Sequence, residues 1–474
     1  MASASDLSAS PLVETPVVER VLGSALGRGA QFAEVFVEDR RGTAASLDDG
    51  RVEELSSGRD RGAGVRVVVG ETTGYAHTAD LSERGLLAAA EAAAAVAREG
   101  GGGSKVVALD ARPVARHGTV EVFPEDVAKA KKIELLERAD QRARSAGGAV
   151  SQVSAHYADS RRRILVASTD GSLVTDDQVR SRIFVTCVAV GDTGMQTGYE
   201  SKAFTVGFEM FDFVDVEEVA ATAARRALVK LSARPAPSGE LPVVLAAGSG
   251  GILFHEACGH GLEADHIVKD ASVYVGQVGR QVASPLVTLV DDGTVSREWG
   301  TVSVDDEGRP SQRNVLIEGG ELTDYMWDFL RARKEGRASS GNGRRQSYRH
   351  LPMVRMTNTF LLDGSEDPAE VVAQTPRGIF VAQLGGGQVN TTTGDFVFGT
   401  SEAYLIEDGK VTEPLRDANL IGNGPEVLRR IDVVADDFAM VPGTCGKDGQ
   451  SVPVGCGQPT LRVSAMTVGG TAGD

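Results

Sequence analysis

The feature that most constrains the fold of this chain is a change of pattern near residue 235. The segment "RRALVKLSARPAPSGELP" (225–242) ends a predicted helix and then runs into a cluster of two prolines, serine and glycine. Such clusters interrupt helices and strands and are typical of connections between domains. At 474 residues the chain is also too long for one ordinary core. We therefore predict two domains, residues 1–235 and 236–474.

Helical and strand-like patterns alternate in the first of these domains. Helices are predicted at 16–30, 81–100 and 125–148, the second opening on an Asp80 or Ser82 cap. Strands are predicted at 32–39 and 64–78, followed by short β runs over 150–191 that an Asp170-Gly171 turn interrupts. The glycine run at 100–103 is expected to be a loop. This pattern indicates a mixed α/β domain in which long helices cover a sheet.

The second domain is strand-like and dense in glycine, for example over 300–328 and 378–415. We expect a mainly antiparallel β domain with a few helices, one of which carries the histidine motif described below. The whole chain is therefore predicted to be α+β.

Charge and composition exclude several classes of function. The net charge is −17, from 49 Lys and Arg against 66 Asp and Glu, so the overall field repels nucleic acid. The first ten residues lack a signal-peptide pattern, and the closest approach to a membrane span, 86–97, is short and contains Glu91. Four scattered cysteines do not make a disulfide framework. We expect a cytoplasmic protein that binds neither nucleic acid nor membrane.

The segment "GILFHEACGHGLEAD" (251–265) places His255 and His260 five positions apart, with Glu256 directly after the first. In a regular α-helix these histidines lie about 140° apart and cannot share a metal ion. If one turn widens to the i→i+5 pattern, they come nearly into line, and such π-turns are frequent at functional sites. Gly259 and Gly261 make that distortion easier. The spacing therefore predicts a π-turn.

A metal held by two imidazoles needs a third protein ligand and an open position for water, while Glu256 can act as general base. The candidates for the third ligand are His266, Glu263, Asp265, His350 and the cysteines. Cys445 is favoured because it lies in a polar, glycine-rich loop. Cys456 is a weaker competitor, and Cys258 is expected to pack in the core. The alternative is that these are ordinary helix histidines.

A basic cluster, Arg344, Arg345, Arg349 and Arg355, stands out in this acidic chain together with Tyr348 and His350. We predict that His350, Tyr348 and Arg349 bind substrate, with the first two as oxyanion donors. The alternative is a solvated loop with structural ion pairs.

Four separated motifs together resemble the TldD branch of the TldD/PmbA metallopeptidases. They are "HEACGHGLEAD", "SSGNGRRQSYRHLPMVRMTNT" (339–359), "CGKDGQSVPVGCGQPTLRV" (445–463) and "MTVGGTAG" (466–473). The resemblance implies a zinc-dependent peptidase for short or unfolded peptides, with His255, His260 and Cys445 as zinc ligands and Glu256 as the catalytic residue. It also implies a heterodimer with a metal-less PmbA (TldE) paralogue; a homodimer is the other possibility. The resemblance implies that the two subunits bind an extended peptide mainly through its backbone. A glycine-rich β domain fits this mode of binding, because strand addition uses main-chain groups.

Two functions are compatible with these features of the sequence. The first is a zinc-dependent peptidase. The rival is a peptide-binding or regulatory module in which the metal is structural and closed by a fourth ligand such as Cys456 or His266, because a saturated zinc holds no water.

Overall fold

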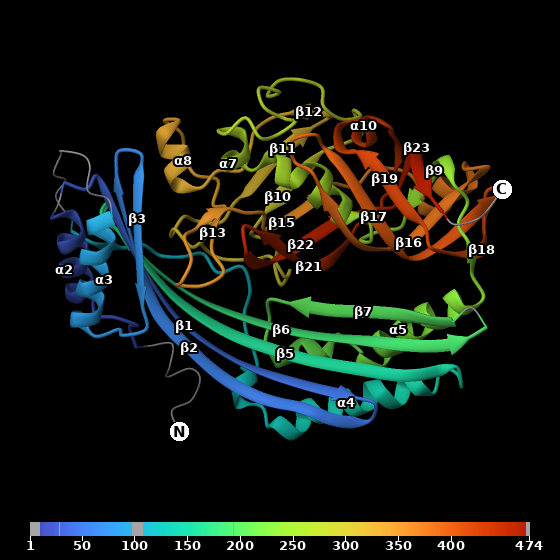
Figure 1. Cartoon of the computed structure of the whole chain (residues 1–474), viewed down its shortest axis with the longest axis horizontal. Coiled ribbons are helices and arrows are strands. Elements are labelled where there is room, and N and C mark those ends of the chain that lie inside the picture. Colours follow the sequence, from blue (N-terminus) through green and yellow to red (C-terminus); the bar gives the residue numbers. More distant parts are fainter. Residues whose placement is uncertain (1–9, 28, 97–107, 193, 471–474) are drawn as a thin grey trace.

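The computed structural model describes residues 10–27, 29–96, 108–192 and 194–470 (Figure 1). The following predictions fall wholly or partly outside these ranges: the missing signal in the first residues, parts of the helices at 16–30 and 81–100, the loop at 100–103, and the end of the "MTVGGTAG" motif. Within the described ranges no helix is long and apolar enough to span a membrane.

The helices and strands follow in chain order. The helices, including short 3₁₀ and π segments (η), are α2 (Thr15–Leu26), α3 (Glu83–Val96), η1 (Pro124–Asp126), α4 (Lys129–Arg144), η2 (Phe208–Asp212), α5 (Val216–Leu231), α6 (Gly251–Phe254), η3 (His255–Gly259), η4 (His260–Leu262), α7 (Ala264–Ile267), α8 (Phe329–Lys334), α9 (Pro368–Ala373) and α10 (Gly424–Arg429). The strands of the N-terminal half are β1 (Phe32–Asp48), β2 (Arg51–Val69), β3 (Thr72–Thr78), β4 (Asp110–Ala111), β5 (Val150–Ser168), β6 (Ser172–Gly191) and β7 (Gly194–Phe204). Those of the C-terminal half are β8 (Arg234–Pro235), β9 (Gly239–Leu245), β10 (Leu289–Asp292), β11 (Arg313–Glu318), β12 (Glu321–Leu322), β13 (Gly343–Arg344), β14 (Met353–Val354), β15 (Asn358–Leu361), β16 (Arg377–Val389), β17 (Asp395–Glu407), β18 (Lys410–Arg416), β19 (Asn419–Asn423), β20 (Ile431–Val434), β21 (Ala439–Lys447), β22 (Gln450–Gln458) and β23 (Leu461–Gly469).

The N-terminal sheet is built from hairpins much longer than the sequence pattern predicts. Its order is β3-β2-β1-β5-β6-β4, with β7 paired to β6. The predicted turn at Asp170-Gly171 is confirmed, and Gly171 has a φ of 89°. The β runs on either side are long strands, not short ones, because β5 and β6 stay paired from Val150 to Ala167. Residues 40–62 also extend β1 and β2, although Arg51–Arg61 are all exposed and show no alternation.

Helices cover this curved sheet on the face turned away from the C-terminal half (Figure 1). α4 and α5 pack through Leu136, Ala139 and Ala223 against Val153 and Val185 of the strands. α2 and α3 form a second cluster at the other end of the sheet. The α3 cap is Ser82, whose Oγ accepts a hydrogen bond from the Gly85 N–H at 3.2 Å. The predicted helices on a sheet are therefore confirmed, which agrees with an α+β fold.

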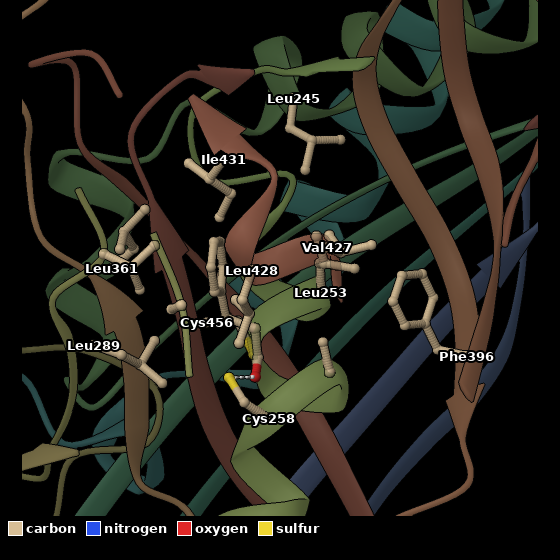
Figure 2. Packing of buried hydrophobic residues seen from close by; sticks show 14 of the residues in the cluster. Leu245, Leu253, Cys258, Leu289, Leu361, Phe396, Val427, Leu428, Ile431 and Cys456 are labelled. Atoms are coloured by element: carbon tan, nitrogen blue, oxygen red, sulfur yellow. Dashed lines mark hydrogen bonds between the residues drawn. The ribbon is translucent and has the colours of Figure 1, made fainter. Parts of the chain in front are cut away.

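The C-terminal half contains two main sheets, and most of their strand pairs are antiparallel. One runs β16-β9-β23-β19-β17-β18-β8, and β16 also pairs with β17, so this sheet closes on itself. The other runs β12-β11-β10-β15-β22-β21 and ends on the β21–β22 hairpin. Parallel pairing occurs at β9–β16, β15–β22 and β8–β18. The large apolar cluster between these elements is shown in part in Figure 2.

Buried ion pairs join the two halves. Glu34 of β1 accepts from Arg66 and from Arg345, and all three side chains are at most 2% exposed. Arg226 of α5 lies 3.0 Å from Glu402 of β17. A boundary at residue 235 would fall within β8, and it remains a prediction.

Candidate metal centre

The helix that carries the histidine motif widens where the spacing of the histidines predicts it. β9 leads through a short turn into α6, which continues as the π-helical turn η3. The His260 N–H donates its hydrogen bond to the His255 carbonyl, five residues earlier. The π-turn prediction is confirmed. As a result, the two imidazole rings lie with their centroids 4.9 Å apart and their planes at 84°.

Three potential metal donors converge at this turn. One ligand atom each of His255, His260 and Cys445 lies within 4.8 Å of the other two. Cys445 Sγ is 3.4 Å from His260 Nε2. His255 Nδ1 is buried and has no hydrogen-bond partner among the described residues. Buried ring nitrogens normally have a hydrogen-bond partner, and this unpartnered imidazole in a group with a thiol fits a nitrogen and sulfur site for a metal.

Cys445 reaches this site from β21, at the edge of its sheet. Its thiol is 2% exposed. Its backbone carbonyl accepts a hydrogen bond from Nη2 of Arg355, whose side chain is fully buried. Arg355 Nη1 also donates to the Gln450 carbonyl across the hairpin, at 3.4 Å. Arg355 therefore holds both strands of the hairpin and sets the position of the thiol.

The electrostatic surroundings favour the metal-binding form of the thiol. Burial alone would raise the pKa of Cys445, but the adjacent His255 and His260 imidazoles outweigh burial and hold it well below its usual range. Burial would lower the pKa of His260, yet Glu263 and Cys445 together raise it to about 9. The thiolate is the species that binds metal ions.

A carboxylate orients His260 from behind, a feature that sequence reasoning missed. Glu263 Oε2 lies 2.9 Å from His260 Nδ1, which leaves Nε2 directed toward Cys445. Lys447 Nζ donates to the same Glu263 oxygen at 2.8 Å and to Asp265 Oδ1 at 2.7 Å. Such carboxylate–histidine pairs fix the ring orientation of metal ligands. The sign of this contact in the sequence is that Glu263 follows His260 by three residues.

Glu263 and Asp265 also form a neighbouring group with His266. The Lys447 ammonium lies between the two carboxylates, where a metal cation would otherwise bind. Burial would raise the pKa of Glu263, but His260 and Lys447 outweigh burial and hold this pKa at about 2. His266 Nε2 lies 3.8 Å from Glu263 Oε2 and does not join His255 and Cys445.

The glycines of the motif are needed for close packing. Gly259 has ordinary helical angles, with φ −51° and ψ −56°. A Cβ there would lie 2.2 Å from Met356 Sδ. A Cβ on Gly251, at the start of α6, would lie 2.5 Å from the Cys456 carbonyl carbon. These contacts let the widened helix lie directly against β22 and the Met356 side chain.

Glu256 follows His255 in the π-turn and is partly exposed, unlike its neighbours. Within the described ranges its carboxylate has no hydrogen bond or ion pair, so it is free to interact with water or substrate.

Models of the three PmbA/TldA metallopeptidase domains match this chain in order. Domain 1 matches residues 33–97, the central domain 123–231 and the C-terminal domain 238–470. A metalloprotease TldD homologue from Haemophilus influenzae is 43% identical over 94% of both chains. The chain belongs to the PmbA/TldD metallopeptidase family. A TldD homologue from Buchnera aphidicola (strain APS) is 40% identical, again over 94% of both chains.

The fold of the family is also seen in a solved structure of TldE from Thermococcus kodakarensis. That structure has a TM-score of 0.77 and 20% identity, and the match covers 95% of this chain and 99% of the other. At this identity the likeness concerns the fold alone.

The remaining cysteines of this family member lie in apolar surroundings. Cys258 donates its S–H to the Phe254 carbonyl at 3.1 Å (Figure 2), as expected for a packing residue. Cys456 is 2% exposed and lies in the same cluster. Its thiol, like that of Cys445, raises the pKa of His255, although burial opposes the shift. Cys456 is nevertheless outside the three-residue donor group that the described residues form.

The three predicted substrate-binding residues make their contacts with the N-terminal sheet. Tyr348 is 2% exposed, and its hydroxyl lies 3.3 Å from Asp60 Oδ1. Arg349 forms a bidentate pair with the same Asp60. His350 Nδ1 lies 2.9 Å from Ser347 Oγ, and its carbonyl accepts from Tyr75. None of these contacts reaches the donor group, which favours a structural role, and substrate binding by these residues stays a prediction.

Arg344, Arg345 and Arg355 of the basic cluster are also buried, at most 3% exposed. Arg344 and Arg355 donate to backbone carbonyls within the C-terminal half. Arg345 pairs with Glu34 of the N-terminal sheet. The alternative of a solvated loop is therefore wrong for these three arginines. The structural ion pairs that this alternative also predicted are present for Arg345 and Arg349.

Proposed function

We propose that this chain is a zinc-dependent peptidase that hydrolyses short or unfolded peptides in extended form. The observation that carries the proposal is the convergence of His255, His260 and Cys445 at the π-turn, with Glu256 next to a donor.

Zinc suits this donor set because it accepts imidazole nitrogen and thiolate sulfur together, and a three-residue protein site leaves one position open. When bound, zinc would activate a water molecule and polarise the scissile carbonyl. His255, His260 and Cys445 would hold it. The unsatisfied His255 Nδ1 and the depressed pKa of Cys445 support this assignment.

Each neighbouring residue then has a distinct task. Glu256 accepts a proton from the attacking water and returns it to the leaving amine. Glu263 keeps the His260 ring oriented, and Lys447 keeps Glu263 ionised. Arg355 positions the backbone of Cys445 and acts only through that residue.

An extended peptide can be held through its backbone by the edge of the sheet that carries Cys445. Among the described strands β21 pairs only with β22, so one of its edges is open for strand addition. Main-chain recognition of this kind tolerates many side chains. The substrate class is therefore unfolded peptide, with little dependence on sequence.

We also propose that the chain works as a dimer, with a metal-less TldE-like paralogue or with a second copy. The support is the half of β2 over Arg51–Arg61, where every residue is exposed and β3 does not pair. Unpaired sheet edges are normally protected or used for association. Native mass spectrometry of the chain, alone and mixed with such a paralogue, tests this point.

The experiment that tests the function combines metal analysis with cleavage of a random-coil peptide. We expect about one zinc per chain, loss of cleavage on chelation, and recovery when zinc is restored. Glu256→Gln should keep the zinc and lower kcat by about 10²–10⁴-fold. Glu318→Gln, an exposed carboxylate at the end of β11, is the matched control and should cleave normally.

Native-rate cleavage by Glu256→Gln would exclude Glu256 as the base. The rival function, a binding module with a structural zinc, predicts four protein ligands and no cleavage by any preparation. X-ray absorption spectroscopy of the zinc-loaded chain distinguishes three protein ligands from four.

A further inference from the structure

A second site lies on the other side of the β21–β22 hairpin. A cavity of about 170 Å³ separates this hairpin from the N-terminal sheet. Its lining includes the five arginines Arg40, Arg162, Arg180, Arg344 and Arg345. Thr444 and Pro453, which are paired across the hairpin, also line it. Because side chains alternate along a strand, Thr444 faces away from the side of β21 on which its neighbour Cys445 lies.

Two of the arginines are buried without an anionic partner. Arg180 is 6% exposed and donates to the Trp299 and Thr301 carbonyls and to the Gln178 side-chain amide, at 2.9–3.2 Å. Arg344 is 3% exposed and donates to the Met356 and Pro453 carbonyls. All of these acceptors are neutral. Burying a guanidinium without a counter-charge is unfavourable by several kcal/mol.

Two further arginines have unused donors at the same cavity. Arg345 is 1% exposed, and its Nε and Nη1 have no hydrogen-bond partner among the described residues. Arg162 Nη2 is likewise buried and unsatisfied. Arg40 lies at the exposed side of the cavity and makes no hydrogen bond or ion pair within the described ranges.

Carboxylates neutralise two of the five arginines, because Arg162 pairs with Glu38 and Arg345 pairs with Glu34. Asp305 accepts three hydrogen bonds, from the backbone N–H groups of Glu307, Arg309 and Gly343. Asp306 pairs with Arg162 at 2.8 Å. Burial, together with repulsion from neighbouring guanidinium groups, lowers the pKa of Arg180 to about 9. Among the described residues, Arg40, Arg180 and Arg344 therefore line the cavity without a carboxylate partner.

We propose that this cavity is a binding site for a small oxyanion, supplied either by free phosphate or by the carboxylate at the end of a peptide. Guanidinium groups bind both oxyanions in bidentate geometry, and the exposed Arg40 at this cavity makes no hydrogen bond or ion pair among the described residues. A cavity of this size accommodates a phosphate ion or a terminal carboxylate. The site does not depend on the proposed hydrolysis.

A bound oxyanion would also stabilise the hairpin that carries Cys445. Arg344 Nη2 holds the Pro453 carbonyl at 2.8 Å, and Pro453 pairs with Thr444, the residue before Cys445. Ligands that bind only the folded state raise its stability in proportion to ln(1 + [L]/Kd). Occupancy of the cavity should therefore be visible as a higher unfolding temperature.

The test uses inorganic phosphate and the full chain, at constant ionic strength set with chloride. Calorimetric titration should give saturable binding, and phosphate should raise Tm. Arg40→Gln, an exposed and unpaired position, should weaken phosphate binding about tenfold, which corresponds to loss of about 1.4 kcal/mol. Arg377→Gln removes another exposed charge, which lies outside the cavity and makes no hydrogen bond or ion pair within the described ranges, and it should leave the phosphate Kd unchanged.

Arg180→Gln, checked by circular dichroism for folding, should abolish binding. The Arg40 comparison stands even if the Arg180 variant does not fold. Absence of saturable binding below about 10 mM phosphate, or the same Kd in the Arg40 and Arg377 variants, would overturn the proposal.

A competition experiment identifies the source of the oxyanion. A hexapeptide with a free C-terminus and its C-terminal amide are each titrated against bound phosphate, in the Glu256→Gln background to prevent cleavage. Displacement by the free acid alone assigns the site to a peptide terminus. Failure of both peptides to displace phosphate assigns it to the free ion, and equal displacement by both would exclude carboxylate recognition.

Discussion

Glu263 contacts His260 of the candidate metal centre directly, with Glu263 Oε2 2.9 Å from His260 Nδ1. The carboxylate binds the ring nitrogen that does not face Cys445, so it controls which nitrogen is available to a metal.

Glu263→Gln should therefore weaken zinc binding by about 10–100-fold, because the neutral amide is a poorer acceptor and leaves Lys447 with less negative charge. Competition against a zinc-binding dye measures the affinity, with Glu318→Gln as the exposed control. An unchanged zinc affinity would mean that Glu263 contributes to folding only.

The two cysteines near His255 can be separated by substitution. Cys445→Ala should leave less than about 0.1 zinc per chain, since it removes one of three donors. Cys456→Ala should keep about one zinc and lose about 1–2 kcal/mol of unfolding free energy, because it removes a buried sulfur from an apolar cluster. Metal content by mass spectrometry and urea unfolding measure the two effects. The reverse pattern would assign the metal to Cys456.

Gly259→Ala should destabilise the protein by about 1–3 kcal/mol, because its new methyl group would overlap Met356 Sδ. If this overlap is the cause, Met356→Ala in the same chain should couple favourably with Gly259→Ala by at least about 1 kcal/mol. Urea unfolding of the single and double variants measures the coupling. Gly58→Ala, where a Cβ meets nothing within 4 Å, is the control. Purely additive effects would remove the packing explanation.

Glu402 should make stability depend on acid pH. Burial raises its pKa, but hydrogen bonds from Arg225, Tyr404 and Arg226 outweigh burial and hold it at about 2. A depressed folded-state pKa contributes stability above the unfolded-state value of about 4.5, and this stability is lost as the pH falls toward 2.

Glu402→Gln should therefore lower the unfolding free energy at pH 7 by about 2–3 kcal/mol and flatten its fall between pH 5 and 2. Guanidinium unfolding across this range measures both. Glu413→Gln breaks the exposed pair with Arg234 and should change neither measurably. Equal pH profiles for wild type and Glu402→Gln would contradict the assignment.

The histidine motif illustrates how much of the site was predictable. The five-residue spacing predicts the π-turn because helix geometry is local: once both rings must share a face, one turn has to widen. The role of Gly259 could not be predicted in the same way, because Met356, which requires it, comes from a distant part of the chain.

The long strands of the N-terminal sheet could not be predicted from the local sequence. Residues 51–61 form part of β2 although they are mostly polar and exposed on both faces, because their hydrogen bonds to β1 hold them extended. The residue pattern within 51–61 carries no information about β1, the strand with which these residues pair. The same reason explains why β5 and β6 are long where short runs are predicted.

The sequence by itself determined the α+β class, the helices of the N-terminal half and the helix widening at His255, since these depend on periodicity and spacing within a few residues. Only the tertiary structure decided which distant side chains meet there. Cys445 lies 185 positions from His260, and Lys447 reaches back to Glu263. The arginines of "SSGNGRRQSYRHLPMVRMTNT" are divided among the contacts with the N-terminal sheet, the β21–β22 hairpin and the arginine-lined cavity. The pairing of β21 with β22 and the packing of that hairpin against the widened helix bring these side chains together, and such long-range contacts leave no periodic trace in the sequence.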